Sequence, residues 1–550
     1  MSHSTRVLSF FSLTFLTLQI AAVAGCDSSG RTNKPPGGGG ADAGAGGDDA
    51  AVPTSTSYTD FPSTPVIDPT GNTPVAAPGL FGPAGSGASS GGPCLTDPEL
   101  GSLFPTNWLP LRFHFVAPTG QNLFEIRLHA EHETNDLVVY TAATTYTMPA
   151  QMWASVAAHI IDEPITVTIR GGTYNGSTLI GGPVTGSAGT ITVAPAAAAG
   201  AIVYWTSSNG TALRGFTVGD TKVQDVLRPN QASTACIGCH SSTPDGAFVA
   251  FSASSDSMNG NPAAFAMRSS DGLLTTPTFI STAAAGLLAR SGQEEPVFSK
   301  AHWQTGDRVG LSMLYMNGSA MYSQYEIVWT DLEATSAAQD MGWGILKRNG
   351  DPGDPVSAAF SHDGTKVVYT SGKSTSGGVT LTDGNLRTIP YNNRLGGDSV
   401  ALTGASDSTY NEFYPAFSSD DQWIAFARLP NGVSSYNEAR TEVFIIPTAG
   451  GTATRVSAND PPACAQRTSP GITNSWPKWA PDTTTVGGRT FYWITFSSTR
   501  IQDKHPQLYI APIVIENGQV KTYPALYLWN QPTDENNHTP AWDNFQIPLQ

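Results

Sequence analysis

The sequence predicts an all-β protein with more than one folded unit. Its 550 residues are too many for one ordinary hydrophobic core. Gly (57) and Pro (40) are abundant, and charged residues make up only 13%, against about 25% in typical globular chains. Short apolar or alternating runs recur between turns, as β-strands do. We therefore expect a small β-sandwich followed by a six-bladed β-propeller.

Residues 1–25 have the pattern of a signal peptide. His3 and Arg6 precede an apolar run over 7–24 that is too short for a durable membrane span. The run ends in Val23-Ala24-Gly25-Cys26, which resembles the lipobox of bacterial lipoproteins. The resemblance implies lipidation of Cys26 after removal of the preceding peptide, and an uncleaved anchor or plain secretory signal is the alternative. We expect a lipid-anchored protein of the bacterial cell envelope, periplasmic or surface-facing, with the choice between inner and outer membrane open.

Residues 26–95 are rich in Gly, Ala, Pro, Ser and Thr. Low-complexity sequence of this kind cannot bury enough apolar surface to offset the entropy lost on ordering. The segment is therefore predicted to be a flexible, disordered tether between the lipid and the folded units.

A β-sandwich is predicted over residues 96–198. Apolar or alternating runs cover 111–116, 123–128, 137–141, 165–170 and 189–193, and Gly, Asn and Pro turns separate them. Strands at this spacing resemble fibronectin type III or immunoglobulin modules. Nothing in the stretch points to catalysis.

From residue 199 to residue 550 the chain repeats an aromatic residue, a turn carrying Asp, and an apolar strand. Phe360, Phe417 and Trp479 begin clear copies, and Ser242, Phe298 and Trp542 begin degenerate ones. Six units about 60 residues apart, each with several short strands, are typical of a radially repeated sheet. A solenoid is the rival architecture, but Asp-Gly hairpin turns favour meandering blades.

These repeats resemble the TolB-type propeller pattern, in which Pro-x-aromatic-Ser-x-Asp-Gly is followed by an apolar strand. The run from Pro415 to Asp421 matches almost throughout, and that from Trp476 to Asp482 matches well. The resemblance implies a propeller fold and says little about activity. The last copy has no room for a blade after it, and the first stretch, near Ala201, lacks an inner strand. We therefore expect the N- and C-terminal strands of this unit to pair and close the ring.

The pentapeptide Cys236-Ile237-Gly238-Cys239-His240 has the C-x-x-C-H spacing of c-type haem attachment. The thiols of Cys236 and Cys239 would add to the two haem vinyl groups, and His240 would be the proximal iron ligand. A local dithiol or disulfide and half of a zinc site are the alternatives. Alignment of the repeats predicts that His240 opens an innermost strand at a mouth of the central channel, and ordinary TolB repeats carry no haem there.

Several residues are candidates for the distal side of the iron. Ring closure would bring His538 beside the haem blade, as a distal ligand or an acid/base group. Met258 and Met267 are rival ligands, and thioether ligation would favour electron transfer. Methionines on strands are more often core residues. An open coordination site is the remaining possibility.

The other motifs say less. Cys94 and Cys464 are an even pair in an oxidising compartment, and they form either a disulfide or two free thiols. The run from Asp256 to Asn261 and that from Asp351 to Asp354 have oxygen ligands that could hold Ca²⁺, without EF-hand spacing.

The formal net charge of −16 argues against nucleic acid as a partner. The sequence has no nucleophile elbow, H-E-x-x-H motif or P-loop. We therefore expect a monomeric, lipid-anchored haem c protein that transfers electrons to a redox partner in the envelope, and whether it is an enzyme stays open. One alternative is a haem peroxidase or oxidase that uses His538 or Glu295 as acid/base. The other is a non-enzymatic scaffold that docks envelope proteins.

Overall fold

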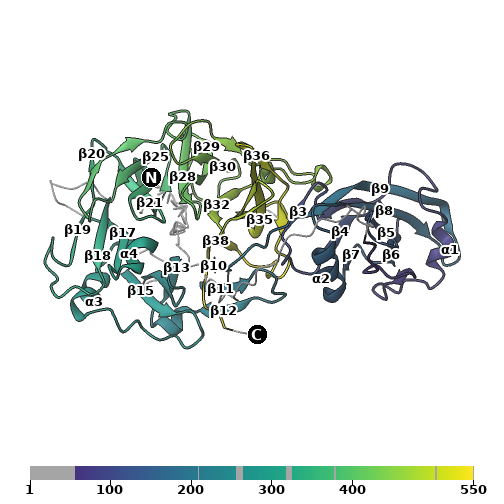
Figure 1. Cartoon of the computed structure of the whole chain (residues 1–550), viewed down its shortest axis with the longest axis horizontal. Coiled ribbons are helices and arrows are strands. Elements are labelled where there is room, and N and C mark those ends of the chain that lie inside the picture. The colour runs from purple at the N-terminus through teal and green to yellow at the C-terminus, as the bar shows by residue number, and fades with distance from the viewer. Residues whose placement is uncertain are drawn as a thin grey trace, which may run out of the picture.

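The computed structural model describes residues 56–208, 210–254, 264–316, 325–376, 380–501 and 505–548. Strands account for 46% of the chain and helices for 8%, which confirms the all-β prediction. Figure 1 shows a smaller N-terminal part beside a larger C-terminal part, with strands from the end of the chain nearest to the smaller part.

The N-terminal part contains two sheets around one apolar core. The larger sheet has the order β1-β6-β5-β8-β9-β3 and the smaller one the order β2-β4-β7. Alternation explains how they pack: in β4, Phe113 and Phe115 are buried whereas the residues between and beside them are more exposed. The strands are β1 (Val66–Ile67), β2 (Cys94–Asp97), β3 (Leu103–Phe104), β4 (Arg112–Val116), β5 (Leu123–His129), β6 (Leu137–Thr141), β7 (Thr145–Thr147), β8 (Pro164–Tyr174) and β9 (Leu179–Val193). The helices are α1 (Ala77–Phe81) and α2 (Ala150–His159).

The tether predicted over 26–95 is wrong for residues 56–95, whereas residues 26–55 lie outside the described ranges. Strand β1 pairs with β6 in parallel, and β2 pairs with β4. Phe61 and Phe81 are each 1% exposed and pack in the core of the N-terminal part. A Gly- and Pro-rich composition therefore concealed a segment in which a few large apolar side chains supply enough burial to order the turns between them.

The C-terminal part consists mainly of six successive sheets of three or more strands within the described residues. Their orders are β12-β11-β10-β38, β13-β14-β15, β16-β17-β18-β19, β21-β22-β25-β27, β28-β29-β30-β31 and β32-β34-β35-β36. In the first three sheets the strands are β10 (Ala201–Thr206), β11 (Ala212–Thr217), β12 (Gln224–Leu227), β38 (Asn537–Asp543), β13 (Cys236–Ser242), β14 (Phe248–Ser254), β15 (Ala264–Ser269), β16 (Gln293–Phe298), β17 (Val309–Tyr315), β18 (Tyr325–Asp331) and β19 (Trp343–Ile345).

In the last three sheets the strands are β21 (Asp354–Phe360), β22 (Lys366–Gly372), β25 (Asn385–Pro390), β27 (Val400–Ala401), β28 (Tyr410–Phe417), β29 (Trp423–Pro430), β30 (Glu442–Pro447), β31 (Thr454–Arg455), β32 (Asn474–Trp479), β34 (Arg489–Ser498), β35 (Gln507–Glu516) and β36 (Gln519–Thr522). The minor elements are β20 (Lys347–Asn349), β23 (Ser374–Ser376), β24 (Thr380–Leu381), β26 (Gly396–Asp398), β33 (Thr484–Val486), β37 (Leu526–Tyr527), α3 (Thr282–Leu288) and α4 (Lys300–Gln304), and three 3₁₀ turns (Pro229–Ala232, Ser457–Asn459 and Ala463–Ala465).

In each of the six sheets, the residue that begins a copy of the sequence repeat lies at the end of one edge strand. We call this edge strand the first strand of its sheet. Ser242, Phe298, Phe360, Phe417 and Trp479 are the last residues of β13, β16, β21, β28 and β32, and Trp542 is the last but one of β38. The Asp of the motif then closes the turn to the second strand. In one turn the hydroxyl of Ser361 donates to Asp363, and in another that of Ser418 donates to Asp420. The same Asp accepts from a backbone N–H two residues later, which is an Asx-turn.

The first strands of the six sheets contact one another in a closed circuit: β13 with β16, then β21, β28, β32, β38 and back to β13 (Figure 1). The circuit closes because β10, near the start of the C-terminal part, pairs antiparallel with β38 at its end. The predicted pairing of the N- and C-terminal strands of this unit is therefore present.

The two parts of the molecule are joined covalently and by packing. Cys94 and Cys464 form a disulfide across a sequence separation of 370 residues, so the bridge that the sequence left open exists in the structure. Phe104 of β3 and Trp493 of β34 belong to the same apolar core. Within the described ranges, no helix is both long enough and apolar enough to span a bilayer.

Candidate functional site

The C-x-x-C-H segment lies within a strand. Strand β13 begins at Cys236, which pairs with Ser254, and Ile237 pairs with Ala253 before the register shifts at His240. The prediction that His240 opens the strand is therefore wrong. The backbone of the segment pairs with β14 from its first residue, and a β-bulge between Ile237 and His240 accommodates the rest.

The two thiols of the segment have different neighbours. Cys236 is half-buried, and the hydroxyl of Thr211, immediately before β11, donates to its Sγ at 3.8 Å. Cys239 is 1% exposed and packs with Val297 and Leu311 of the sheet after β13. The thiols therefore lie in different surroundings, and they are not joined by a disulfide. Burial raises the pKa of the Cys236 thiol, although the hydrogen bond from Thr211 opposes this effect.

His240 is 1% exposed and is held by the backbone of β10. Its Nε2 lies 3.0 Å from the carbonyl oxygen of Val203, which can only accept, so Nε2 carries the proton. Nδ1 is then an acceptor, and it is buried without a hydrogen-bond partner. Burial lowers the pKa of His240 to about 4, against the hydrogen bond to Val203, and the charge of Lys478 lowers it further. The ring is therefore neutral at pH 7.

His538 lies in β38, the first strand of the sheet that also contains β10. Strand β38 contacts β13. Its ring stacks on Trp476 with a centroid distance of 5.1 Å and meets the edge of Trp205 at 4.7 Å. Nε2 lies 3.2 Å from the Ser207 hydroxyl, whereas Nδ1 is buried without a partner. Burial, and then the proximity of His240, lower its pKa to about 3.

A β-bulge recurs in the first strands, and it sets the direction of the side chains near their ends. Five residues, each three positions before the motif aromatic, adopt left-handed φ angles of 46–56°: Glu295, Ser357, Tyr414, Trp476 and Thr539. Such angles are uncommon for residues other than glycine and recur where the surrounding structure fixes them. Cys239 holds the equivalent position in β13.

Strand β16 carries two carboxyl groups near its bulge, those of Glu294 and Glu295. Glu295 Oε2 accepts from the backbone N–H of Ser357 at 2.6 Å, whereas its Oε1 and Glu294 Oε2 are buried without partners. Burial raises the pKa of both glutamates to about 8. Lys478, which the sequence analysis missed, acts on both Glu295 and His240. Its only sequence signal is its position next to the motif residue Trp479.

We name His240, Glu294, Glu295, Lys478 and His538 the first-strand cluster, because each comes from the first strand of its sheet. Its histidines are buried (1% and 2% exposed), which corrects the prediction of a site open at a channel mouth.

The remaining predicted ligands fall elsewhere. Cys26 and Met258 lie outside the described residues, as does the run 256–261 that was predicted to bind Ca²⁺. Met267 is 3% exposed and packs in an apolar cluster. In the run from Asp351 to Asp354, both oxygens of Asp351 accept hydrogen bonds from protein donors, among them Arg348 and Ser371. No cluster of three or more His, Cys, Asp or Glu side chains arranged for a metal ion occurs among the described residues.

The segment fits a covalent haem only in part. Two neutral imidazoles with unpartnered nitrogens lie in neighbouring first strands, and this is the donor type that haem iron accepts. The thiols do not fit, because Cys239 is 1% exposed and packs inside an apolar cluster, where a porphyrin edge cannot reach its sulfur. Thioether attachment thus requires a conformation of residues 236–240 other than the one described.

No family model matches the chain, and no curated protein matches it. Among solved structures, similarity is found to one of two prolyl endopeptidases (13% identity, TM-score 0.29, covering 60% of this chain and 47% of that one). It is also found to hydrazine synthase of Kuenenia stuttgartiensis (12%, TM-score 0.31, 57% and 89%). A third is a hypothetical selenium-binding protein of Sulfolobus tokodaii (9%, TM-score 0.35, 78% and 96%). The chain spans about half the length of the prolyl endopeptidase, and likenesses at these TM-scores support no inference about function.

Proposed function

We propose that the C-terminal part is a six-bladed propeller of the TolB type, and that the N-terminal part is a sandwich of the fibronectin or immunoglobulin type. The closed circuit of first strands and the β10–β38 pairing support the propeller, because radial repetition requires both features. The match of the sequence repeat to the ends of the first strands supports it further.

We propose that this propeller carries a covalent haem on Cys236 and Cys239 and acts in electron transfer. The observation that carries the proposal is the pair of unpartnered imidazole nitrogens, on His240 and His538, buried beside the C-x-x-C-H segment. Buried polar atoms without partners are rare, and each costs about 1–3 kcal/mol. A bound group that engages these nitrogens would remove that cost. Haem, when bound, supplies one-electron redox chemistry.

The extended conformation of β13 weighs against attachment as the segment stands. Only Cys236 and Ile237 pair with β14 before the bulge, so the part that must rearrange is short. We therefore propose that, for haem to attach, the residues from Cys236 to the bulge separate from β14.

We propose that the protein is anchored in the cell envelope by lipid on Cys26 and acts there as a monomer with a redox partner. The lipobox-like sequence and the Cys94–Cys464 disulfide support an oxidising compartment.

The test is the optical spectrum of the full chain, co-expressed with the cytochrome c maturation machinery, together with its pyridine haemochrome. Electron transfer predicts covalent haem c, a six-coordinate low-spin spectrum and no reaction with peroxide. A high-spin haem that reacts with peroxide would favour the enzyme instead. Absence of covalent haem would favour the hypothesis of a non-enzymatic scaffold that docks envelope proteins.

A matched pair of variants tests the distal ligand. His538→Ala should convert the spectrum toward high spin, because it removes the imidazole nearest to His240. Met267→Leu, which changes a methionine in an apolar cluster, should leave the spectrum unchanged. If Met267→Leu changed the spectrum and His538→Ala did not, His538 would not be the distal ligand.

A further inference from the structure

A cavity of about 270 Å³ lies between the two parts of the molecule, next to the Cys94–Cys464 disulfide. Its N-terminal wall comes from β2, the turn after it and β4. Its C-terminal wall comes from β35, β37 and the loops near Pro461 and Arg500. Neither the haem motif nor the first-strand cluster takes part in it, so whatever the cavity binds is independent of the proposed haem.

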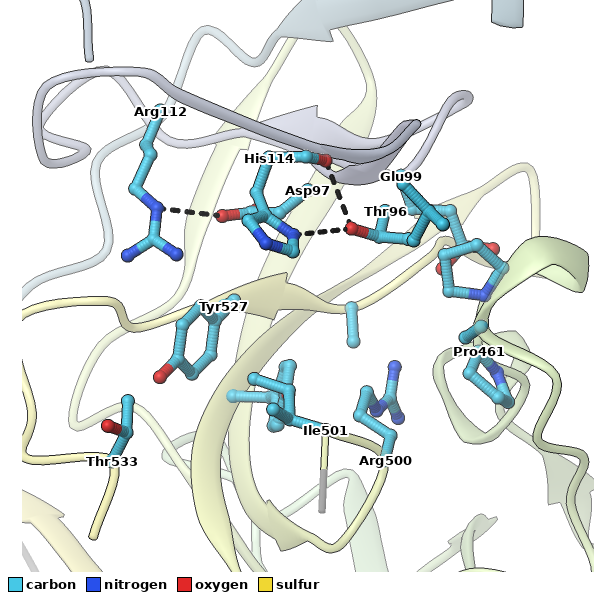
Figure 2. Close-up of a pocket in the computed structure, with 15 residues that line it drawn as sticks. Thr96, Asp97, Glu99, Arg112, His114, Pro461, Arg500, Ile501, Tyr527 and Thr533 are labelled. Atoms are coloured by element: carbon cyan, nitrogen blue, oxygen red, sulfur yellow. Dashed lines mark hydrogen bonds and ion pairs between the residues drawn. The ribbon is translucent and has the colours of Figure 1, made fainter. Parts of the chain in front are cut away.

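Arg112 reaches across this cavity with its two terminal nitrogens open to a ligand. Figure 2 shows the side chain extending from β4 toward Tyr527 on the opposite wall, and the guanidinium carbon lies 5.7 Å from the centroid of the Tyr527 ring. Nε is buried, 3.9 Å from Asp97 Oδ2 and beyond hydrogen-bond distance. Nη1 and Nη2 are not fully buried, and they donate to no atom of the described residues. A guanidinium fork of this kind binds a carboxylate through two parallel hydrogen bonds.

The second arginine of the cavity, Arg500, is bonded to the protein itself. Its Nε donates to the Ser498 hydroxyl, and its Nη2 donates to the backbone oxygen of Ala458 and to the side-chain oxygen of Asn474. Arg500 therefore adds positive charge to the cavity, whereas Arg112 supplies the donors for a ligand.

Two carboxyl groups, of Asp97 and Glu99, face these arginines and make the charge of the cavity depend on pH. Burial raises the pKa of both to about 7, although Arg112 opposes this effect at Asp97 and Arg500 opposes it at Glu99. At pH 7 the two carboxyls therefore carry about one negative charge together, against the two positive charges of the arginines. The cavity attracts an anion at this pH, and more strongly at lower pH.

The other titratable groups around the two carboxyls do not reverse this sign. Asp460, which acts on Glu99, is ion-paired with Arg455. Burial, and then the charge of Arg112, lower the pKa of His114, so this ring adds no charge at pH 7. Burial raises the pKa of the hydroxyls of Tyr509 and Tyr527, so both stay protonated.

Apolar side chains form much of the remaining lining. Val116 and Ile501 are 49% and 48% exposed, so they lie where the cavity opens to solvent, and Pro461, Pro462 and Ala525 also line it. An inorganic anion would leave this surface in water, whereas an aliphatic or aromatic group would cover it. Sites for drug-sized ligands measure about 300–1,000 Å³, so a cavity of about 270 Å³ holds a single small ring or a short chain.

We propose that this cavity binds a small organic carboxylate with an apolar body. Arg112 holds the carboxylate through Nη1 and Nη2, and the apolar body packs against Val116 and Ile501. A protonated Asp97 or Glu99 can donate to the bound carboxylate, whereas an ionised one repels it. Binding therefore takes up protons, and the affinity falls as the pH rises through about 7.

The experiment is isothermal titration calorimetry of the full chain at pH 6 and at pH 8. The probes are benzoate, phenylacetate and hexanoate, each set against its uncharged amide, and inorganic phosphate is the anion without an apolar body. At pH 6 at least one carboxylate should bind about tenfold more tightly than its amide and than phosphate. The affinity of that carboxylate should be about tenfold lower at pH 8, because at least one carboxyl group must then take up a proton.

Three results would overturn the proposal. One is that no carboxylate probe binds at pH 6. Another is that the amide or phosphate binds as tightly as the carboxylate. The third is an affinity for the carboxylate that does not fall between pH 6 and pH 8.

Variants then locate the binding. Arg112→Gln should weaken binding of that carboxylate about tenfold or more at pH 6, because it removes the charged fork. Asp97→Asn, which resembles the protonated carboxyl, should retain binding at pH 6 and reduce the loss of affinity at pH 8. Arg228→Gln, at an exposed position of the C-terminal part, is the matched control and should change neither. Thermal unfolding of each variant shows that it is folded. A folded Arg112→Gln variant that binds as tightly as the wild type, or no more weakly than Arg228→Gln, would mean that the probe binds elsewhere.

Discussion

The N-terminal and C-terminal parts each bury a charged cluster, but they satisfy its hydrogen bonds to different extents. In the N-terminal part, Arg170 Nε and Nη2 donate to both oxygens of Glu125, and the Tyr140 hydroxyl donates to one of them. Arg170 Nη1 donates to backbone oxygens, among them that of Pro83. In the first-strand cluster, by contrast, both histidines and both glutamates keep an unpartnered buried atom.

The difference teaches that burial of charge alone does not mark a functional site. The Glu125–Arg170 pair ties the segment before β2 to the sheet, and its oxygens and nitrogens are engaged by the protein itself. The first-strand cluster has bonding capacity left over for a bound group. The following predictions test this contrast, from the largest expected effect to the smallest.

Arg170→Met should destabilise the N-terminal part by about 3–5 kcal/mol, because it leaves the buried Glu125 carboxylate without its partner. The free energy of unfolding from urea denaturation measures this. The double variant Glu125→Gln/Arg170→Met should lose less than Arg170→Met alone, since no uncompensated charge remains. A double variant as unstable as the single one would show that the pair does not stabilise as a unit.

Cys94→Ser/Cys464→Ser should lower the free energy of unfolding by about 2–4 kcal/mol, because the bridge closes a loop of 370 residues between the compared parts. Urea denaturation of the variant and of the reduced wild type should give the same midpoint, below that of the oxidised protein. An unchanged midpoint would show that packing alone joins the two parts.

The unpaired carboxyls of the first-strand cluster predict a pH dependence of stability. Burial raises the pKa of Glu294 and of Glu295 to about 8 from the ordinary 4.5, so the folded state retains protons that the unfolded state has released. Their contribution is complete below about pH 4.5 and is lost as the pH rises through about 8. Thermal unfolding should show Tm falling between about pH 6.5 and 8, because at lower pH the lowered pKa values of the buried His240 and His538 give an opposite trend.

The variant Glu294→Gln/Glu295→Gln should remove roughly 5 °C or more of that fall in Tm. Above about pH 6.5 the remaining slope should have the same sign, because burial raises the pKa of Asp97 and of Glu99 to about 7. Glu131→Gln, at an exposed position of the N-terminal part, is the control and should leave the profile unchanged. If the double variant kept the full wild-type slope, the two carboxyls would not be protonated in the folded state.

Arg489→Met should cost less than about 1 kcal/mol, because its bidentate pair with Asp162 is exposed to solvent and screened by salt. The urea midpoint of this variant, set against that of Arg170→Met, isolates the effect of burial. A loss as large as that of Arg170→Met would mean that exposed pairs between the two parts are as important as buried ones.

The sequence predicts the architecture of the C-terminal part because its signal repeats. Phe360, Phe417 and Trp479 end first strands as expected, since an aromatic residue followed by an Asx-turn is a local signal that does not depend on distant contacts. The pairing of β10 with β38 could also be predicted, because an incomplete unit at each end requires it.

Features that depend on long-range packing could not be predicted in this way. The C-x-x-C-H spacing makes Cys236 and His240 candidates for haem attachment, but it does not predict the pairing with β14 that extends the segment. Composition hid the folding of residues 56–95, whose order depends on a few residues such as Phe81 packing on distant strands. The cavity between the two parts joins residues 96–116 to residues 461–533, and no local spacing reports that juxtaposition.

The central claim, that Cys236 and Cys239 carry a covalent haem beside the first-strand cluster, is tested most directly by intact mass. The full chain, co-expressed with the cytochrome c maturation machinery and denatured, should be heavier than its polypeptide by the mass of one haem. Cys236→Ser/Cys239→Ser should lose that increment, whereas Cys94→Ser/Cys464→Ser should retain it. A wild-type chain without the increment, or a Cys236→Ser/Cys239→Ser variant that retains it, would contradict the account.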